Sequence, residues 1–375
     1  MRAVGLALLG ISVSHAIYDF NYFDNLRRNG NESNVTAIKS PSNNERLWNV
    51  TLNNGDTFNL AQFSVFLPFS DGTNIREAAE NEMAAALMAV HHFNNPELSP
   101  HLTLTEDLAD IADCKIKLTA DFHDTRYSPI DTTRLFTNIL QRENVFKEPA
   151  PSGVIGAYRS AVTSPLAILT GVNGIPQVSH ASTSTDFDVK EQYPYFGRTV
   201  SSSTGEAAVL VQLFQSLGST HVGILFVTDA FGSALQKAFQ DAASEVSIVT
   251  DSVAFSYSAD LSGDEIPNAV ASLKGTQFRH LLIIAFELHY ATIMTEAYDQ
   301  GLVGDDYMWI FDGMDYITFH NSLRFPEGMC TVFLEASVVQ FHHGIVSQSV
   351  AIRAKFRFLS FQVPHLQRQL AVSES

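Results

Sequence analysis

The chain has 375 residues, of which 45% are hydrophobic, and carries a formal net charge of −17 at pH 7. This length and apolar content suffice for one large core or two ordinary ones, and we expect two similar lobes. Only 23 Lys and Arg residues are spread along the chain, against 40 Asp and Glu residues. Nucleic acid is therefore excluded as a partner, since binding to phosphates needs clustered positive charge.

The N-terminus has the pattern of a secretory signal peptide over residues 1–16. Arg2 precedes an apolar run from Ala3 to Val13, and small residues, Ser14 and Ala16, stand at the expected cleavage positions. The alternative is a buried strand or helix at an ordinary N-terminus. No later run approaches the ~20 apolar residues that a membrane span needs. We therefore expect a chain that is secreted or lies on the extracellular face of the plasma membrane, attached to the membrane only if a downstream segment is missing.

Residues 17–59 form a polar, Asn-rich leader. The leader contains three N-x-S/T sequons, which are acceptors for N-linked glycans, at Asn31, Asn34 and Asn49. Their clustering in a segment without apolar periodicity predicts an exposed, glycosylated stretch of a secreted protein.

The two cysteines, Cys114 and Cys330, leave two alternatives open. A disulfide between them would close a long loop, worth about 5 kcal/mol in the chain-entropy model. Two unpaired buried thiols fit the sequence at least as well. No Cys and His spacing typical of zinc occurs, and no cofactor is predicted.

From Leu60 onward, apolar runs of strand length alternate with segments of helical periodicity. Such alternation argues for parallel sheets with right-handed crossovers, and we assign residues 60–198 to a first lobe. Its strands and helices are predicted, in chain order, at Phe63–Phe69, Ile75–Phe93, Lys115–Phe122, Thr132–Gln141, Gly153–Gly156, Thr163–Gly171 and Ile175–Ser179.

A second alternating series predicts a second lobe at residues 199–338. Thr204 is expected to cap its first helix, which runs to Leu217. The fold class is therefore α/β, with two doubly wound parallel-sheet lobes joined by a hinge. Residues 339–375 lack clear periodicity and are predicted to be an incomplete return to the first lobe or an aberrant tail. The remaining elements of the second lobe are predicted at Val222–Val227, Phe231–Ala243, Val246–Val249, Val253–Tyr257, Ile266–Leu273, Leu281–Phe286, His289–Gln300 and Tyr307–Phe311.

Hydroxyl side chains follow two strands of the first lobe. Ser160 follows the strand at Gly153–Gly156, and Ser182 and Thr183 follow the strand at Ile175–Ser179. Ligands of open parallel sheets bind beyond the carboxyl ends of strands, where helix N-termini offer unpaired N–H groups. Hydroxyls and N–H groups suit a carboxylate because they supply donors without a competing charge. The alternative for Ser182 or Thr183 is a plain N-cap role.

Acidic side chains follow the strands of the second lobe. The strand ends carry Thr228–Gly232, then Glu287, then Asp312. Carboxylates there would complement an amine, so that a zwitterion could bridge the two lobes. The alternative is that Glu287 and Asp312 are solvated or cap helices. Phosphate loops, dinucleotide-binding glycine motifs, zinc-protease motifs and nucleophile elbows are all missing from the sequence, so no enzyme is predicted.

Several segments occur in the order typical of one receptor family, namely Phe66–Phe69, Val90–Leu98, Asp124–Thr125, Gly153–Thr199, Thr228–Gly232 and Asp312–Gly313. With them the chain resembles the Venus flytrap ligand-binding region, of the periplasmic binding protein type I class, found in class C G-protein-coupled receptors and natriuretic peptide receptors. The resemblance covers about Leu60 to Leu334. It implies a two-lobed domain that closes on a small polar ligand such as an amino acid, and a homo- or heterodimer through the first lobe.

The resemblance also implies roles for particular residues. Ser182 and Thr183 fall in the loop that holds the ligand's α-carboxylate. Phe231 stands where these receptors often carry a tyrosine against the ligand. Glu287 and Asp312 fall near the ligand amine. Ser160 is aligned less securely, because the family's carboxylate-binding serine matches Ala161 better.

We therefore predict the extracellular ligand-binding domain of a receptor, acting by lobe closure. One alternative is a soluble or truncated remnant that does not signal, for which Ala161, Phe231 and the irregular tail argue. The other is an enzyme on the same scaffold, since a fold does not determine a function, although no motif supports it.

Overall fold

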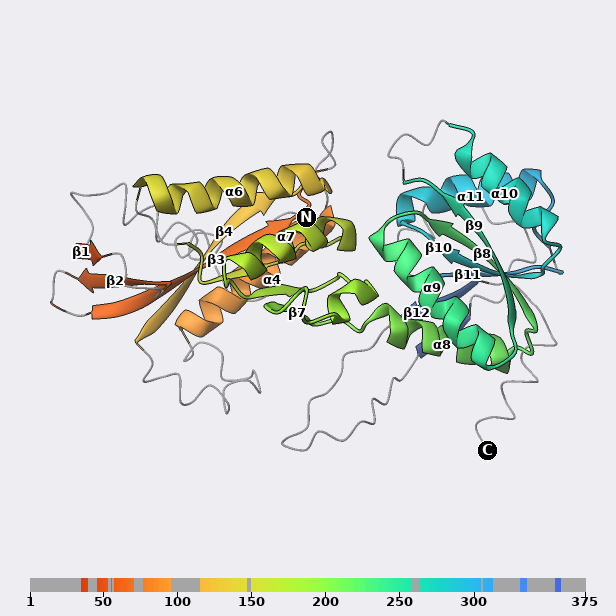
Figure 1. Cartoon of the computed structure of the whole chain (residues 1–375), viewed down its shortest axis with the longest axis horizontal. Coiled ribbons are helices and arrows are strands. Elements are labelled where there is room, and N and C mark those ends of the chain that lie inside the picture. The colour runs from red at the N-terminus through yellow and green to blue at the C-terminus, as the bar shows by residue number, and fades with distance from the viewer. Residues whose placement is uncertain are drawn as a thin grey trace. The chain divides into compact units, whose positions relative to one another are not determined.

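The structure is a computed structural model that describes residues 35–39, 46–52, 55, 57–70, 77–95, 115–146, 150–257, 263–304, 306–312, 331–335 and 355–358. The contacts between Cα atoms divide the chain into two compact units, residues 1–200 and residues 201–375. Each unit is an α/β structure built on its own sheet (Figure 1). None of the helices in the described ranges combines the length and apolarity that a membrane span requires.

The sheet of the first unit is mostly parallel. β3 lies at its centre and pairs in parallel with both β4 and β5, while β1 and β2 add an antiparallel edge. β5, β6 and β7 continue the parallel part. The seven strands are β1 (Val35–Lys39), β2 (Leu47–Leu52), β3 (Thr57–Leu67), β4 (Ile116–Asp124), β5 (Gly153–Ile155), β6 (Gln177–Ser179) and β7 (Phe196–Arg198).

The segment predicted as a polar leader contributes strands to this sheet. In β2, Trp48 and Val50 are buried and pack with Leu60 of β3, while Asn49 between them is exposed. The core strands of this sheet therefore begin at β2, well before Phe63. The alternation of apolar and polar residues in β2 is short and lies among asparagines, so the periodicity of the sequence did not predict this strand.

Helices cover both faces of the first sheet. On one face, Met83 and Val90 of α4 (Glu77–Asn94) pack against the central strands. On the other face, Phe136 of α6 (Pro129–Phe146) and Leu166 of α7 (Ser160–Val172) share a cluster with Phe66 of β3. Strands buried on both sides are the expected result of parallel pairing with crossover helices.

The sheet of the second unit has five parallel strands and one antiparallel edge strand. The order is β13, β12, β11, β10, β8, β9, and only β13 runs antiparallel to its neighbour. The strands are β8 (His221–Val227), β9 (Val249–Phe255), β10 (His280–Ile284), β11 (Met308–Phe311), β12 (Thr331–Glu335) and β13 (Lys355–Phe358).

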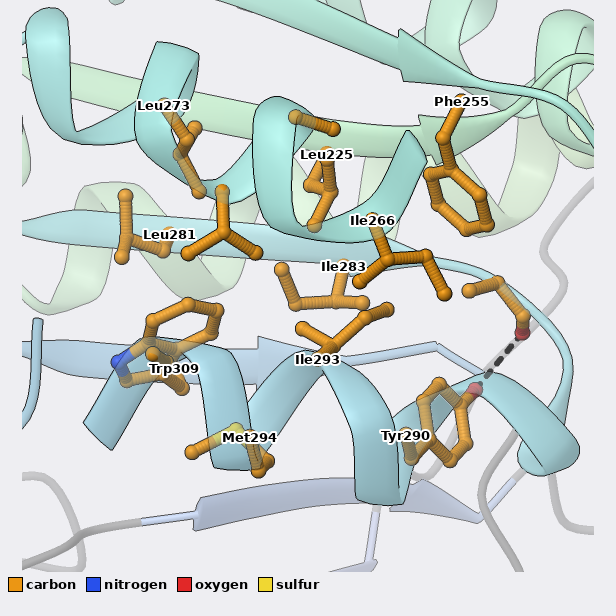
Figure 2. Close-up of a cluster of buried hydrophobic side chains, with 14 of the residues drawn as sticks. Leu225, Phe255, Ile266, Leu273, Leu281, Ile283, Tyr290, Ile293, Met294 and Trp309 are labelled. Carbon is orange, nitrogen blue, oxygen red and sulfur yellow. Dashed lines mark hydrogen bonds between the residues drawn. The ribbon is translucent and has the colours of Figure 1, made fainter. Parts of the chain in front are cut away.

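Of the helices that the structure describes, two pack on each face of this second sheet (Figure 1). One face carries α8 (Ser203–Ser216) and α9 (Ala230–Glu245), and the other carries α10 (Glu265–Gly275) and α11 (Glu287–Asp299). Trp309 of β11 and Ile283 of β10 lie against Ile293 and Met294 of α11 in the core of the second face (Figure 2). The α/β fold class with parallel sheets is thus as expected from the alternation of elements.

Two local expectations for the second unit are wrong. One strand, β9, replaces the pair predicted at Val246–Val249 and Val253–Tyr257, because residues 246–248 form the turn that ends α9. Ser247 in that turn has a left-handed backbone, with φ of 62°. The cap position of α8 is Ser202 instead of Thr204, so the helix begins at Ser203.

Some predicted features lie outside the described residues. These are the signal peptide, Asn31, Asn34, Cys114, Cys330 and most of residues 339–375. Asn49, the remaining sequon, is exposed on β2 and is accessible to a glycan. The described part of the C-terminal segment, β13, pairs with β12 in the second sheet.

The start of α9 approaches the end of β8 very closely at Gly232. A Cβ atom built on Gly232 would lie 2.1 Å from the carbonyl oxygen of Val227 and 2.8 Å from its Cγ1. The backbone carbonyl of Val227 would have to move to make room for a Cβ atom, which is energetically costly, so only glycine fits here.

We expect Gly232→Ala to lower the free energy of unfolding by about 1–3 kcal/mol, since the added methyl group forces the helix away from the strand. Gly275→Ala at the end of α10 is the matched control, because a Cβ there would meet nothing within 4 Å. Urea unfolding monitored by circular dichroism measures both. Equal stability of the two variants would show that the close approach is not a constraint.

Candidate functional site

Three loops lie together at the carboxyl edge of the first sheet, after β4, β5 and β6. The hydroxyl of Ser182, after β6, is 2.6 Å from the hydroxyl of Thr163 on α7 and 3.2 Å from the carbonyl oxygen of Ala157 after β5. Ser179 donates to the same carbonyl at 2.7 Å and accepts the N–H of Ser182 at 3.0 Å. The buried Ser182 hydroxyl therefore joins two strand-end loops to each other.

Ser160 makes a second connection between these loops. It is the first residue of α7 and is buried, and its hydroxyl accepts the N–H of Ser184 at 3.2 Å. The residue that caps the following 3-10 helix, Thr185–Asp188, is Ser184, whose side chain accepts from the N–H of Asp186. The alternative cap role for Ser182 or Thr183 is therefore wrong.

The structure brings Ser160, Ser182 and Thr183 into one region, as the sequence suggested. In the sequence Thr183 lies between Ser182 and Ser184, which are both buried, and Thr183 is itself partly exposed. Of the three hydroxyl residues, Thr183 is thus the one with exposed surface, although its Oγ1 atom is itself buried, and the serines hold the loops around it.

A buried arginine at the same edge was not predicted. Arg159, one residue before α7, is 8% exposed, and its Cζ lies 3.9 Å from the ring centroid of Tyr127 after β4. Tyr158 links this pair to His180 after β6, with ring centroids 6.4 Å from Tyr127 and 5.9 Å from His180. The signal in the sequence was present, since Arg159 directly precedes Ser160 in a strand-end loop.

The cationic and aromatic side chains extend across the strand ends of β4, β5 and β6, with β3 between β4 and β5. His180 Nε2 is 3.8 Å from Oε1 of Glu82 on α4, which makes the pair an ion pair when the imidazole is protonated. The edge as a whole offers a guanidinium, a hydroxyl and ring faces. Such a set is suited to the anionic group of a small molecule.

The loop after β8 in the second unit is shaped by Asp229. As the N-cap of α9, its carboxylate accepts from the N–H groups of Phe231 at 3.0 Å and Gly232 at 2.8 Å. This cap fixes the start of the helix, and the ring of Phe231 packs partly buried over the end of the core, 5.4 Å from the ring of Phe286.

Phe231 belongs to an aromatic cluster that was also not predicted. Its other members are Phe286 after β10, Tyr257 after β9 and His289 on α11. The ring of Tyr257 is 5.6 Å from those of both Phe286 and His289. Tyr257 is 36% exposed, so this aromatic cluster reaches the surface at the carboxyl edge of the second sheet.

Asp312, directly after β11, is buried at the same edge. Burial raises the pKa of its carboxyl well above the usual value, and the neighbouring carboxylate of Glu206 on α8 raises this pKa further. Asp312 is therefore held toward its neutral form and is not a simple negative charge. Its carbonyl oxygen accepts a hydrogen bond from the hydroxyl of Tyr290 on α11.

Glu287 is the first residue of α11, at the end of β10. Its side chain lies outside the part of the chain that the structure describes. Phe231, Glu287 and Asp312 thus all belong to the carboxyl edge of the second sheet, after β8, β10 and β11 respectively. Among the described residues, no group of three or more His, Cys, Asp or Glu side chains is arranged to hold a metal ion.

The chain belongs to the receptor family ligand-binding region, whose family model matches residues 81–350. That region is a ligand-binding part of receptors and not an enzyme. The expected resemblance to class C receptors is confirmed.

Similar proteins include two kinds of receptor. The chain is 29% identical to the human extracellular calcium-sensing receptor over 171 residues, which are 45% of this chain and 16% of that receptor. It is 27% identical to the rat metabotropic glutamate receptor 4 over 178 residues, 44% of this chain and 18% of the relative. The human metabotropic glutamate receptor 8 is 31% identical over 103 residues, 27% of this chain and 11% of the relative. The matched part is thus less than a fifth of each relative's length.

Replacing Asp312 by Asn should flatten the dependence of stability on pH. Because the folded-state pKa of Asp312 lies above its unfolded value near 3.9, the native state binds the proton more tightly. Its stabilising contribution is complete below the unfolded pKa and is lost as pH rises through the folded-state pKa, with a slope of at most about 1.4 kcal/mol per pH unit. The neutral amide keeps its contribution at every pH.

Urea unfolding at a series of pH values from 4 upward measures this effect. Asp251→Asn on β9 is the control, because Asp251 is exposed. If Asp312→Asn and Asp251→Asn follow the wild-type pH profile equally, Asp312 is not held toward its neutral form.

Proposed function

We propose that this chain is the extracellular ligand-binding domain of a receptor and that it binds a small, amino-acid-like molecule. The observation that carries the proposal is the placement of polar and aromatic side chains at the carboxyl edges of both parallel sheets. Ligands of parallel α/β sheets bind at that edge. The membership in a ligand-binding receptor region supports the same conclusion.

In the first lobe, the ligand's carboxylate would be held by Thr183 and Arg159. Arg159 supplies positive charge, and its guanidinium is positioned by the ring of Tyr127. Ser160 and Ser182 act mainly by holding the loops, since their hydroxyls bond to other groups of the protein. This division of roles differs from that expected from the sequence, where Ser182 was a direct contact.

In the second lobe, Phe231 and Tyr257 would contact the body of the ligand. Glu287 would take the ligand's ammonium group. Asp312 is held toward its neutral form before a ligand binds. An ammonium brought next to Asp312 would lower its pKa and displace its proton, so that the carboxyl would become a countercharge on binding.

Ligand binding would favour a closed arrangement of the lobes. A ligand that touches both carboxyl edges gains all its contacts only when the lobes close, so it shifts the population toward the closed state. We further propose that residues 1–16 direct secretion and that Asn49 carries a glycan. Attachment to a membrane would depend on sequence outside this chain.

Thr183→Ala should weaken binding of an amino-acid ligand by about tenfold, the loss expected for one hydrogen bond to a charged group. The wild-type chain is first titrated calorimetrically with the standard L-amino acids, and the amino acid that binds is then titrated into the variant. X-ray scattering with and without that amino acid measures closure.

The matched control is Thr295→Ala on α11, whose exposed hydroxyl bonds only to a carbonyl of its own helix. Binding unchanged in Thr183→Ala would remove Thr183 from the site. A wild-type chain that neither binds nor closes with any amino acid would argue for a remnant without a ligand.

We also propose that the first lobe forms a dimer through α7. Two large apolar side chains are exposed on α7, with exposed fractions of 41% for Ile168 and 81% for Val172. On the adjacent helix α6, Ile130 is 77% exposed. Ile168 and Val172 are four residues apart on α7 and so lie on the same face of this helix, and exposed apolar surface of this kind can mark a protein–protein contact.

Val172→Glu should shift a dimer toward monomers, because a buried charge at an interface costs more than the lost methyl contacts. Sedimentation velocity over a range of concentrations measures the dimer. Val249→Glu, at an exposed apolar position on β9, is the matched control. A sedimentation profile equal to that of the control would place any dimer elsewhere.

A further inference from the structure

A pocket lies at the amino-terminal edge of the second sheet, opposite the carboxyl edge that carries Phe231 and Asp312. It has a volume of about 450 Å³ and is formed by the loops that lead from α8 into β8 and from α10 into β10. This volume is within the range of small-molecule pockets, roughly 300 to 1,000 Å³. No residue assigned to the candidate ligand site lies in this pocket.

The side chains lining this pocket are almost all hydrogen-bond donors. His221, Arg279 and His280 supply nitrogen donors, while the hydroxyls of Thr220 and Thr276 form hydrogen bonds within the protein. None of the described residues that line the pocket is a carboxylate. This basic lining contrasts with the net charge of −17 of the whole chain.

The two histidines have their Nδ1 atoms engaged within the loops. Thr220 Oγ1 is 3.0 Å from Nδ1 of His221, and the hydroxyl of Ser219 lies against Nδ1 of His280. Where the hydroxyl donates to Nδ1, the ring proton is on Nε2, which can then donate to a ligand. Partial burial lowers the pKa of His280, so its imidazole acts there as a neutral donor.

Arg279 brings a fixed positive charge, and Phe278 brings an apolar surface. The Arg279 guanidinium lies over the ring of Tyr307, with Cζ 4.5 Å from the centroid, which restricts its position. The ring of Phe278 is 5.1 Å from that of His221, in an edge-to-face contact. Gln277, which directly precedes Phe278, has a left-handed backbone, with φ of 61°, a conformation that is uncommon for residues other than glycine.

The basic side chains are not needed to cap the helices that end here. The final carbonyl groups of α8 accept from the N–H groups of Leu217 and Gly218. Those of α10 accept from the N–H groups of Thr276 and Gln277 and from the hydroxyl of Thr276. Hydrogen bonding to the last carbonyl groups, one ordinary reason for basic residues at helix ends, therefore does not explain this set.

We propose that this pocket binds a small molecule that carries a phosphate or sulfate group. The oxyanion would lie between Arg279, His221 and His280, and the remainder of the molecule would contact Phe278. Guanidinium and imidazole N–H groups make short, charge-assisted hydrogen bonds to such oxyanions. The proposal is independent of the amino-acid site, because it uses the other edge of the sheet.

Calorimetric titration of the full chain with phenyl phosphate tests the proposal. Inorganic phosphate and phenol are the companion probes, which separate the oxyanion from the ring. We expect saturable binding of phenyl phosphate, no binding of phenol, and a loss of about tenfold or more in affinity in Arg279→Gln. Equal affinity for inorganic phosphate would assign the site to the free ion, and weaker affinity would assign it to an ester.

Lys237→Gln on α9 is the matched control, since it removes the same charge from an exposed ion pair with Asp241 outside the pocket. His221→Gln is a second variant, at an exposed position, and thermal unfolding verifies that each variant is folded. The proposal is overturned if phenyl phosphate shows no saturable binding. It is also overturned if Arg279→Gln and His221→Gln bind phenyl phosphate as tightly as Lys237→Gln does.

Discussion

Parallel strand pairing is the constraint on which both units of this protein depend. A parallel strand can be joined to its neighbour only by a crossover, and the crossovers place helices on both faces of each sheet. β8, β10 and β11 are consequently apolar on both sides and contribute to two separate hydrophobic clusters. Because the strands share one direction, every loop that leaves a carboxyl end emerges at the same edge. The chemistry of the candidate site follows from that alignment.

The loops at these edges are stabilised by hydrogen bonds of their own. In the first sheet, the hydroxyls of Ser160 and Ser182 connect the loops after β5 and β6. In the second, Asp229 caps α9 and sets the position of Phe231. A hydroxyl-rich loop therefore need not present all its hydroxyls to a ligand. Buried donors of this kind hold the loops in place, and the ligand contact proposed here falls to their partly exposed neighbour, Thr183.

Much of the fold was predictable because buried strands leave strong apolar runs. β8, β10 and β11 were expected within a few residues of their observed bounds. β2 was not, since its buried residues Trp48 and Val50 are separated by polar ones in an Asn-rich segment. A local pattern gives the type of an element most reliably when the element is long and buried on both faces.

For the candidate site, the sequence predicted which residues follow the ends of strands, but not the contacts between the loops. Position in the sequence placed Thr183 and Phe231 in strand-end loops. It could not indicate that Tyr127 would lie against Arg159, because that contact depends on β4 and β5 both pairing with β3. The raised pKa of Asp312 likewise depends in part on Glu206, which lies beside it in the structure but is far from it in the sequence.

Tyr290 has a consequence for how the second lobe could respond to a ligand. Its buried hydroxyl lies 2.8 Å from the carbonyl oxygen of Ala285, after β10, and 2.5 Å from that of Asp312, after β11. The Tyr290 hydroxyl thus connects the two loops that carry Glu287 and Asp312. The Tyr290 ring packs against the ring of Phe311 in the core. The hydroxyl therefore fixes the spacing between these two loops. For a ligand bound as proposed, this part of the surface would be ordered in advance, so that little conformational entropy would be lost there.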